Sequence, residues 1–263
     1  MRKAFISVVI LILIAIMQLT LMTAQGYSGN QILLPLLTKP VTVDGKWTAA
    51  DEWSDAVVIT LINCNCSSVT ANGYLYAKHD PSNFYFLIDF ASSTVLDGQH
   101  DNMDVFLDPL HNGGTVPQSD DRVFVVGTSG GVMNVGAGVS QWSLNNPLPE
   151  GVKVVFSMAG SSNRAQPHEI VEFMVPFSMF SGMQNTIGFS VAAGHGSVGS
   201  SEFSLALWPA NRQRDNPSTW GEVTVSSTPI PEFSSVWSVI AATLLVSVTL
   251  TWSRRRTSSK GLV

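Results

Sequence analysis

The sequence predicts an all-β fold, a two-sheet antiparallel β-sandwich that spans residues 41–226. Short runs with strand character recur every ~10–20 residues in this region, and glycines and prolines separate them. In the run from Val152 to Met158, every second residue is apolar, which is typical of a half-buried strand. No stretch of the region repeats its apolar residues with the helical period of 3.6. Together these patterns predict a sandwich of short strands.

Nine runs have the composition of strands. A turn with the sequence HDPSN lies between the second and the third of them, which therefore form a predicted hairpin. Residues 177–180 have the pattern of one short helical turn. The predicted strands are Val57–Ile62, Tyr74–Lys78, Phe84–Phe90, Met103–Leu107, Val123–Gly127, Val152–Met158, Ile170–Val175, Thr186–Ala192 and Glu222–Val225.

The N-terminal residues have the layout of a secretory signal. Arg2 and Lys3 precede an apolar run that ends near Leu19, and Ala24-Gln25-Gly26 offers small residues for cleavage. The apolar run is shorter than the ~20 residues that a membrane span prefers, which favours a cleaved signal over an uncleaved anchor. We therefore expect a helical signal peptide over residues 1–26 and a linker over residues 27–40.

A second apolar run, from Val236 to Trp252, lies near the C-terminus and is followed directly by three arginines. A run of this length can cross a membrane as a helix, and the arginines should remain cytoplasmic. We expect a transmembrane helix over residues 236–253 and a basic cytoplasmic tail over residues 254–263. The chain before them would then be exported and held at the outer face of the plasma membrane or the cell surface.

A short motif precedes this run, in the predicted linker 227–235. Pro231, Glu232 and Phe233, followed by an apolar helix and arginines, resemble the Pro-Glu-Phe sorting signals of archaeal surface proteins. The resemblance implies an archaeosortase-like processing enzyme as a partner. A plain membrane anchor fits the same residues.

The predicted exported part is strongly acidic. Residues 27–230 contain eight Lys+Arg and eighteen Asp+Glu, a net charge of −10, whereas the whole chain carries −5. Nucleic acids require a basic surface, so we exclude them as partners. An acidic surface suits metal cations.

The two cysteines, Cys64 and Cys66, lie two positions apart. In an exported chain a disulfide is the first expectation, and two free buried thiols are the alternative. A zinc or iron–sulfur site would need more ligands at characteristic spacings. Asn65 begins the sequon Asn-Cys-Ser, which indicates a glycosylation candidate in an exposed loop.

Six segments follow one another in an order that resembles family 9 carbohydrate-binding modules and the wider DOMON-like sandwich superfamily. The resemblance spans residues ~41–225. It implies a jelly-roll or DOMON-like sandwich with structural calcium that binds sugar chains, in which two tryptophans clamp a pyranose ring. The segments are VDGKWTAADEWSDA, LYAKHDPSNFYFLIDF, DNMDVFLDPLHNGG, SDDRVFV, VEFMVPFSMF and PSTWGEVTV.

Aspartates cluster in and around the third of these segments. Calcium selects six to eight oxygen ligands from carboxylates and carbonyls, so the cluster predicts a Ca²⁺ site; a solvated acidic loop is the alternative. The candidate ligands are Asp97, Asp101, Asp104, Asp108, Asp120 and Asp121.

Aromatic residues in loop-like surroundings are the candidates for stacking on a sugar ring. Trp142 and Trp208 are the predicted contacts, and Asn211 and Arg212, which lie nearby in the sequence, are the predicted partners of the hydroxyl groups. Trp47, Trp53 and Trp220 lie beside segments that close the fold, and we assign them to structure. The predicted ligand is an oligosaccharide or polysaccharide.

Two other functions remain open on the sequence. Some DOMON-like sandwiches hold haem b between methionine and histidine or lysine ligands, for which Met103, Met158, Met174, His168 and Lys78 are candidates. A surface adhesion module without a small ligand is the second alternative. Catalysis is not expected, because no nucleophile or glycosidase motif accompanies the aspartates. An enzyme for which the module is an accessory would be another chain.

Overall fold

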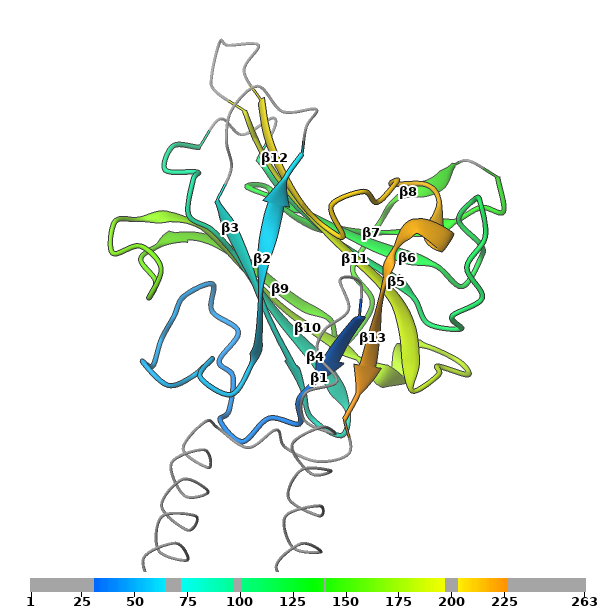
Figure 1. Cartoon of the computed structure of the whole chain (residues 1–263), viewed down its shortest axis with the longest axis horizontal. Helices are drawn as coiled ribbons and strands as arrows, with labels where there is room; N and C mark the ends of the chain where they lie inside the picture. Colours follow the sequence, from blue (N-terminus) through cyan, green and yellow to red (C-terminus); the bar gives the residue numbers. More distant parts are fainter. Residues whose placement is uncertain (1–30, 65–71, 97–100, 140, 197–202, 227–263) are drawn as a thin grey trace, which may run out of the picture. The chain divides into compact units, whose positions relative to one another are not determined.

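Thirteen strands and two short 3₁₀ helices make up the computed structural model, which describes residues 31–64, 72–96, 101–139, 141–196 and 203–226 (Figure 1). The all-β prediction is confirmed. In chain order the elements are β1 (Gln31–Leu34), β2 (Val57–Asn63), β3 (Gly73–His79), β4 (Asn83–Phe90), β5 (Asn102–Asp108), β6 (Arg122–Gly127), β7 (Gly130–Gly136), β8 (Trp142–Asn146), β9 (Lys153–Ala159), β10 (His168–Pro176), η1 (Phe177–Met179), β11 (Thr186–Gly196), β12 (Phe203–Trp208), η2 (Pro217–Thr219) and β13 (Gly221–Val225).

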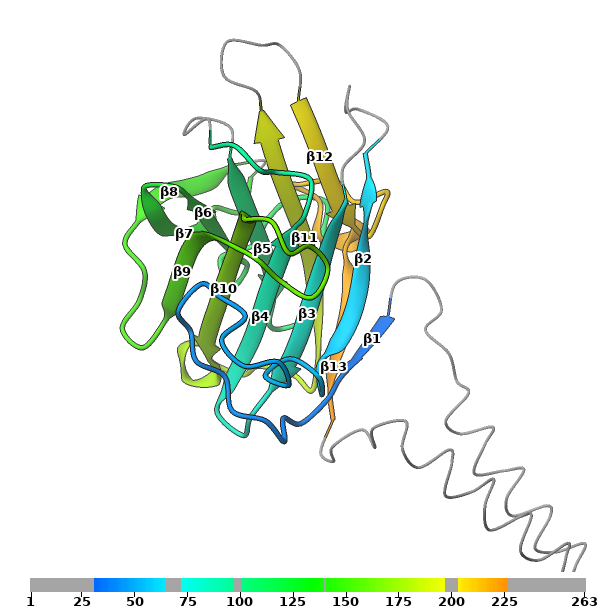
Figure 2. The same cartoon turned by 90° about the vertical axis from the view of Figure 1, so that its left-hand side faces the viewer.

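The strands form one hydrogen-bonded sheet rather than the two separate sheets that we predicted; eleven of them form a continuous path, and β13 pairs with β11 and β1 beside it. The path runs β8-β7-β6-β5-β11-β12-β2-β3-β4-β10-β9. It folds at the contact between β12 and β2, where Ala206 pairs with Asn63 and Leu207 with Ile62. The sheet therefore still has two layers, and Figure 2 looks onto the layer of β2, β3, β4, β10 and β9.

The hydrophobic core lies between the two layers. Alternate residues of β4, such as Phe86, are fully buried against alternate residues of β5 and β11. The rings of Phe86 and Phe189 stack with centroids 5.1 Å apart. This alternation of apolar residues is the pattern that made the strands recognisable in the sequence.

The predicted linker at residues 27–40 is wrong for its described part. Residues Gln31–Leu34 form β1, which pairs with β13 in parallel, and Ile32 and Leu34 are buried in the core. Leu37 then donates a backbone hydrogen bond to the carbonyl of His79. A run of four residues before a proline is too short to be recognised as a strand in the sequence. Its extended conformation is decided by the burial of alternate side chains against the rest of the fold.

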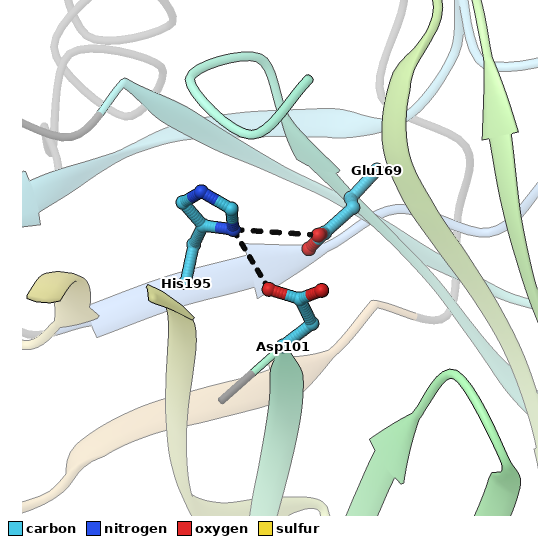
Figure 3. Close-up of side chains that lie close together, drawn as sticks. All are labelled: Asp101, Glu169 and His195. Carbon is cyan, nitrogen blue, oxygen red and sulfur yellow. Dashed lines mark hydrogen bonds and ion pairs between the residues drawn. The ribbon is translucent and has the colours of Figure 1, made fainter. Parts of the chain in front are cut away.

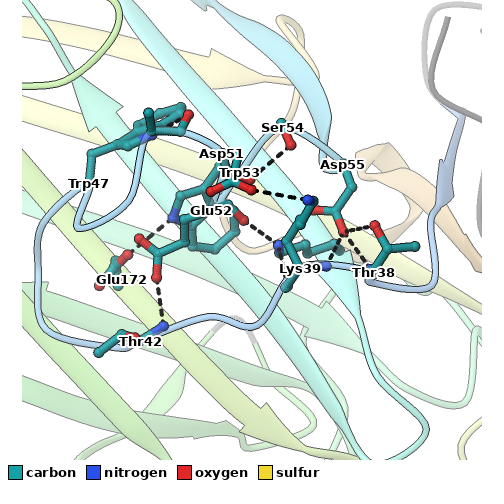
Figure 4. Close-up of polar contacts among 12 residues, drawn as sticks. Thr38, Lys39, Thr42, Trp47, Asp51, Glu52, Trp53, Ser54, Asp55 and Glu172 are labelled. Carbon is teal, nitrogen blue, oxygen red and sulfur yellow. Dashed lines mark hydrogen bonds and ion pairs between the residues drawn. The ribbon is translucent and has the colours of Figure 1, made fainter. Parts of the chain in front are cut away.

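The segment between β1 and β2, residues 35–56, is held by buried charges on the outer face of the layer that contains β3 and β10 (Figure 4). Lys78 of β3 donates to Asp55 at 2.7 Å, and both side chains are almost fully buried. Glu172 of β10 accepts from the backbone N–H groups of Asp44 and Gly45 at 2.8 Å and from the Trp53 indole at 3.2 Å. Trp53, which we assigned to structure, is 1 % exposed.

Strands β7, β8 and β12 were missed in the sequence. β7 contains three glycines, and its side chains alternate weakly. β8 and β12 contain Trp142 and Trp208, which polar and proline-containing neighbours made look like loop residues. The helical turn predicted near residue 177 is present as η1.

The predicted signal peptide, the Pro-Glu-Phe motif and the C-terminal apolar run lie outside the described residues. Within the described ranges, no helix has the length and apolar character needed to cross a membrane.

Candidate functional site

Two candidate sites lie on the outer face of β5. Asp104, Phe106 and Asp108 point away from the core, because they alternate with the core residues of the strand. Their register partners on β11 are small and leave space beside them: Ala192, Ser190 and Gly188.

The first site is the tryptophan cluster, which consists of Phe106, Val123, Trp142 and Trp220. The indoles of Trp142 and Trp220 are parallel to within 7°, with centroids 6.4 Å apart. Phe106 lies below both, 6.0 Å from Trp142 and 5.4 Å from Trp220. The guanidinium carbon of Arg212 lies over the Phe106 ring at 4.3 Å. The cluster thus combines two parallel rings with a cation.

The segment between β12 and β13 lies beside β8 (Figure 1) and supplies hydrogen-bond acceptors to both indoles. The Trp142 indole donates to Asp215 at 2.7 Å, and the Trp220 indole donates to the carbonyl of Gln213 at 3.0 Å. These contacts leave Trp142 and Trp220 only 7 % and 6 % exposed. Both rings are therefore held by residues 209–220.

Several polar atoms around the cluster are buried and lack a hydrogen-bond partner among the described residues. They are Asp104 Oδ1, Arg212 Nε, Arg212 Nη1 and Asn216 Oδ1. Burial raises the pKa of Asp104 to about 6, against the opposing effect of Arg212 and Arg214. Burial also lowers the pKa of Arg212 to about 10. Unpaired buried donors and acceptors are unfavourable, and the hydroxyl groups of a ligand could pair with them.

The spacing of the indoles sets a condition on any sugar that binds between them. A ring packed on both faces needs about 3.5–4 Å on each side, or about 7–8 Å in total. The centroids are 6.4 Å apart, and the planes can be no further apart than that. A pyranose ring can therefore enter only if residues 209–220 move outward.

The second site is the carboxylate cluster, which consists of Asp108, Asp120 and Asp121. One oxygen atom from each residue lies within 4.8 Å of the others. Asp121 is fully buried; its Oδ2 accepts from the Gln118 backbone at 2.6 Å, and its Oδ1 has no partner among the described residues. Asn112 donates its side-chain amide to Asp120 at 3.2 Å.

Two glycines allow Asp108 to take its position. The backbone N–H of Gly113 donates to Asp108 Oδ2 at 2.8 Å, and Gly113 has φ +61°, a conformation that glycine tolerates best. A Cβ on Gly188 would lie 2.9 Å from the Cβ of Asp108, so a larger residue there would displace the carboxylate.

The electrostatics of the carboxylate cluster favour a cation or a proton. Burial raises the pKa of Asp121 to about 7, and the negative charges of Asp108 and Asp120 add to the shift. Burial also raises the pKa of Asp108. Three carboxylates that converge on one point repel each other unless a positive charge lies between them.

The structure brings together half of the predicted acidic set. Asp108, Asp120 and Asp121 meet in the carboxylate cluster, whereas Asp104 belongs to the tryptophan cluster. Asp101 lies elsewhere, beside Glu169 and His195 (Figure 3). Asp97 lies outside the described residues. Strand alternation explains the division, because positions 101 and 104 point to opposite faces of β5.

The prediction for Trp208 is wrong. This indole is 6 % exposed, belongs to the core between the layers and contacts Phe189 with centroids 5.8 Å apart. Arg212 contacts the Phe106 ring of the tryptophan cluster, while Asn211 is exposed. Sequence reasoning missed Trp220, which we assigned to structure because it lies in the closing segment PSTWGEVTV.

The histidine and the lysine among the candidate haem ligands have other partners. His168 uses both ring nitrogens, one toward Asp89 at 2.6 Å and one toward the Gln166 carbonyl at 2.8 Å. The Lys78 amine is bound to Asp55, and Met103 is fully buried in the core. Haem b at these ligands would require these bonds to break.

Cys64 is disulfide-bonded. Cys66, its predicted partner, and the glycosylation candidate Asn65 lie outside the described residues.

The sequence matches no family model and no curated protein. The fold is similar to solved structures. A family 9 carbohydrate-binding module from Caldicellulosiruptor kristjanssonii in complex with cellotriose is 15 % identical, with a TM-score of 0.56, over 77 % of this chain and 96 % of that chain. The same kind of module in complex with glucose is 15 % identical, with a TM-score of 0.55, over 76 % and 100 % of the two chains.

A protein from Bacteroides uniformis with a provisional assignment as carbohydrate-binding is 12 % identical, with a TM-score of 0.50, over 75 % of this chain and 99 % of that chain. The described part of the chain therefore has the fold of family 9 carbohydrate-binding modules.

Proposed function

We propose that this protein is a non-catalytic carbohydrate-binding module that binds a neutral sugar at the tryptophan cluster. The observation that carries the proposal is the pair of parallel indoles beside buried polar atoms that lack partners. Indole faces pack on the apolar face of a pyranose. Asp104 and Asn216 offer acceptors to its hydroxyl groups, and Arg212 offers donors. The opposite charges of Asp104 and Arg212 offset each other, which suits an uncharged ligand.

The fold supports this proposal. The similar modules were solved with cellotriose and with glucose, so these two sugars are the first ligands to test. Because the indoles are too close for a sandwiched ring, we propose that residues 209–220 open when the sugar binds.

Replacing Asp104 by asparagine or Trp220 by alanine is expected to weaken sugar binding at least about tenfold. A hydrogen bond to a charged group contributes about 1.5–3 kcal/mol, and 1.4 kcal/mol corresponds to a factor of ten. Isothermal titration with cellotriose and glucose measures the effect. Trp47→Ala is the matched control, because Trp47 is partly exposed and lies in the segment on the other layer.

Equal binding by wild-type protein and Asp104→Asn would contradict the assignment of the site. Loss of binding in Trp47→Ala alone would move the site to the other layer. No binding to a panel of oligosaccharides would favour the adhesion alternative. Thermal unfolding of each variant separates a lost contact from a lost fold.

We also propose that the carboxylate cluster holds a structural Ca²⁺ ion. Three carboxylates supply hard oxygen ligands, and Asp121 Oδ1, which is buried and has no hydrogen-bond partner among the described residues, is available to a cation. Such an ion would join the end of β5 to the loop before β6. It would fix the strand that carries Asp104 and Phe106.

For the location, we propose that the module is exported and held at the cell surface by the C-terminal apolar run. The basis is the sequence pattern alone: a basic start before an apolar run, and a second apolar run followed by arginines. Processing at Pro231-Glu232-Phe233 by an archaeosortase-like enzyme is part of this proposal.

A further inference from the structure

A third polar cluster lies at the edge of the core, where apolar residues would be expected. The cluster consists of Asp101, which directly precedes β5, Glu169 of β10 and His195 of β11. Each lies two positions from a core residue of its strand, so its side chain points into the space between the layers (Figure 3). Asp101 and Glu169 are 4 % and 0 % exposed. The three ligand-type groups thus come from both layers and meet inside the sandwich.

One nitrogen atom is the centre of this cluster. His195 Nδ1 lies 2.7 Å from Asp101 Oδ1 and 3.6 Å from Glu169 Oε1. The hydroxyl of the buried Ser93 lies 2.8 Å from the same nitrogen and donates to Glu169 Oε1 at 2.6 Å. Four donor atoms from four separate segments therefore converge on one point.

The arrangement does not fit nucleophilic catalysis. A serine–histidine–aspartate relay needs the serine on one ring nitrogen and the carboxylate on the other. Here Ser93 and Asp101 both face Nδ1. One oxygen atom from each of Ser93, Asp101 and Glu169 faces the same ring nitrogen, so an ion bound to that nitrogen would meet all three.

One of these distances already suits a tetrahedral metal ion, and the others are hydrogen-bond distances that would lengthen on binding. Zinc binds histidine nitrogen and carboxylate oxygen at ~2.0–2.2 Å, which places neighbouring ligand atoms ~3.3–3.6 Å apart. The distance between His195 Nδ1 and Glu169 Oε1 already has this value, and the shorter distance to Asp101 would open by less than ~1 Å on binding. An imidazole ligand favours zinc and related first-row metals over calcium, which prefers oxygen atoms alone.

We propose that Asp101, Glu169 and His195 form a binding site for a divalent first-row transition metal, with Zn²⁺ as the first candidate. Ser93 or water would complete the coordination. Because β5 and β11 belong to one layer and β10 to the other, the ion would join the two layers. The site is independent of the tryptophan cluster and of the carboxylate cluster.

Zinc titration of the full-length, chelator-treated protein tests this site, with Ca²⁺ present in excess to occupy oxygen-only sites. We expect wild-type protein and Asp121→Asn to bind one Zn²⁺ at this site with equal affinity. His195→Gln should bind it at least about tenfold more weakly, since loss of even an outer partner of a metal ligand has an effect of that size. Co²⁺ serves as a second probe, and its visible absorption should lose the signature of nitrogen coordination in His195→Gln.

Unchanged zinc affinity in His195→Gln, or no zinc binding by the wild-type protein, would overturn the proposal. Thermal unfolding in the presence of chelator tests whether His195→Gln folds. If it does not, Asp101→Asn, which keeps the size of the side chain, replaces it in the same titration. Binding lost in Asp121→Asn and kept in His195→Gln would assign zinc to the carboxylate cluster instead.

Discussion

Replacing Lys78 by methionine is expected to destabilise the protein by about 3–5 kcal/mol. The Lys78 side chain is 0 % exposed, and its amine donates to Asp55 Oδ1 at 2.7 Å and to the carbonyl of Lys39 at 2.9 Å. Its amine also lies 5.2 Å from the centroid of the Trp53 ring. Methionine fills similar space without a charge, so the buried Asp55 carboxylate would lose its counter-ion. Removing one partner of a buried ion pair is costly for this reason.

The loss is large compared with the total stability of an ordinary domain, about 5–15 kcal/mol. Urea unfolding followed by tryptophan fluorescence measures it. The matched control is Lys39→Met, because Lys39 and Asp51 form an exposed ion pair at 3.0 Å. An exposed pair contributes little to stability, because water screens the charges and the side chains lose entropy on pairing.

A double variant isolates the pair itself. Asp55→Asn keeps an acceptor for the backbone N–H of Lys39, which now donates to Asp55 at 2.7 Å, and removes the negative charge. Lys78→Met with Asp55→Asn should therefore be more stable than the sum of the two single changes predicts, by about 0.5–3 kcal/mol. Additive losses would show that Lys78 stabilises the protein through its backbone contacts alone.

Most of the fold could be predicted from the sequence because burial alternates along its strands. Val57–Ile62 and Phe84–Phe90, for example, were recognised within one residue of their observed limits. β7 and β1 were missed because glycine in one case and shortness in the other weaken that alternation. The union of the strands into one folded path depends on the short contact between β12 and β2, for which local sequence carries no signal.

The candidate sites were harder to predict, because they depend on which strands become neighbours. Three aspartates of one stretch meet as expected, since a single hairpin brings them together. Trp142 meets Trp220 only because the edge strand β8 and the segment before β13 both bring their rings close to Phe106 of β5. The groups at Asp101, Glu169 and His195 are more than 20 residues apart, and nothing in the chain marks them as neighbours.

In the presence of chelator, the wild-type protein is expected to lose stability relative to Asp121→Asn as the pH rises from 5 to 8. The pKa of Asp121 is about 7 in the folded protein and about 4 when unfolded. Between these values the folded state binds a proton that the unfolded state has released, so this contribution to stability is complete below pH 4 and is lost as the pH rises through 7. Asparagine resembles the protonated carboxyl group at every pH. Between pH 5 and pH 8 the free energy of unfolding of the wild-type protein should therefore fall, relative to that of Asp121→Asn, by about 1 kcal/mol or more.

Calcium is expected to reverse this order at pH 8. The ion binds the deprotonated carboxylates and only in the folded state, so it stabilises the wild-type protein, while Asp121→Asn lacks one ligand. Thermal unfolding of both proteins at pH 5 and 8, with calcium and with chelator, gives the full comparison. A gap that does not change with pH would show that Asp121 titrates normally. Equal stabilisation of both proteins by calcium would place the ion away from Asp108, Asp120 and Asp121, because a buried carboxylate that contacts the ion cannot be lost without effect.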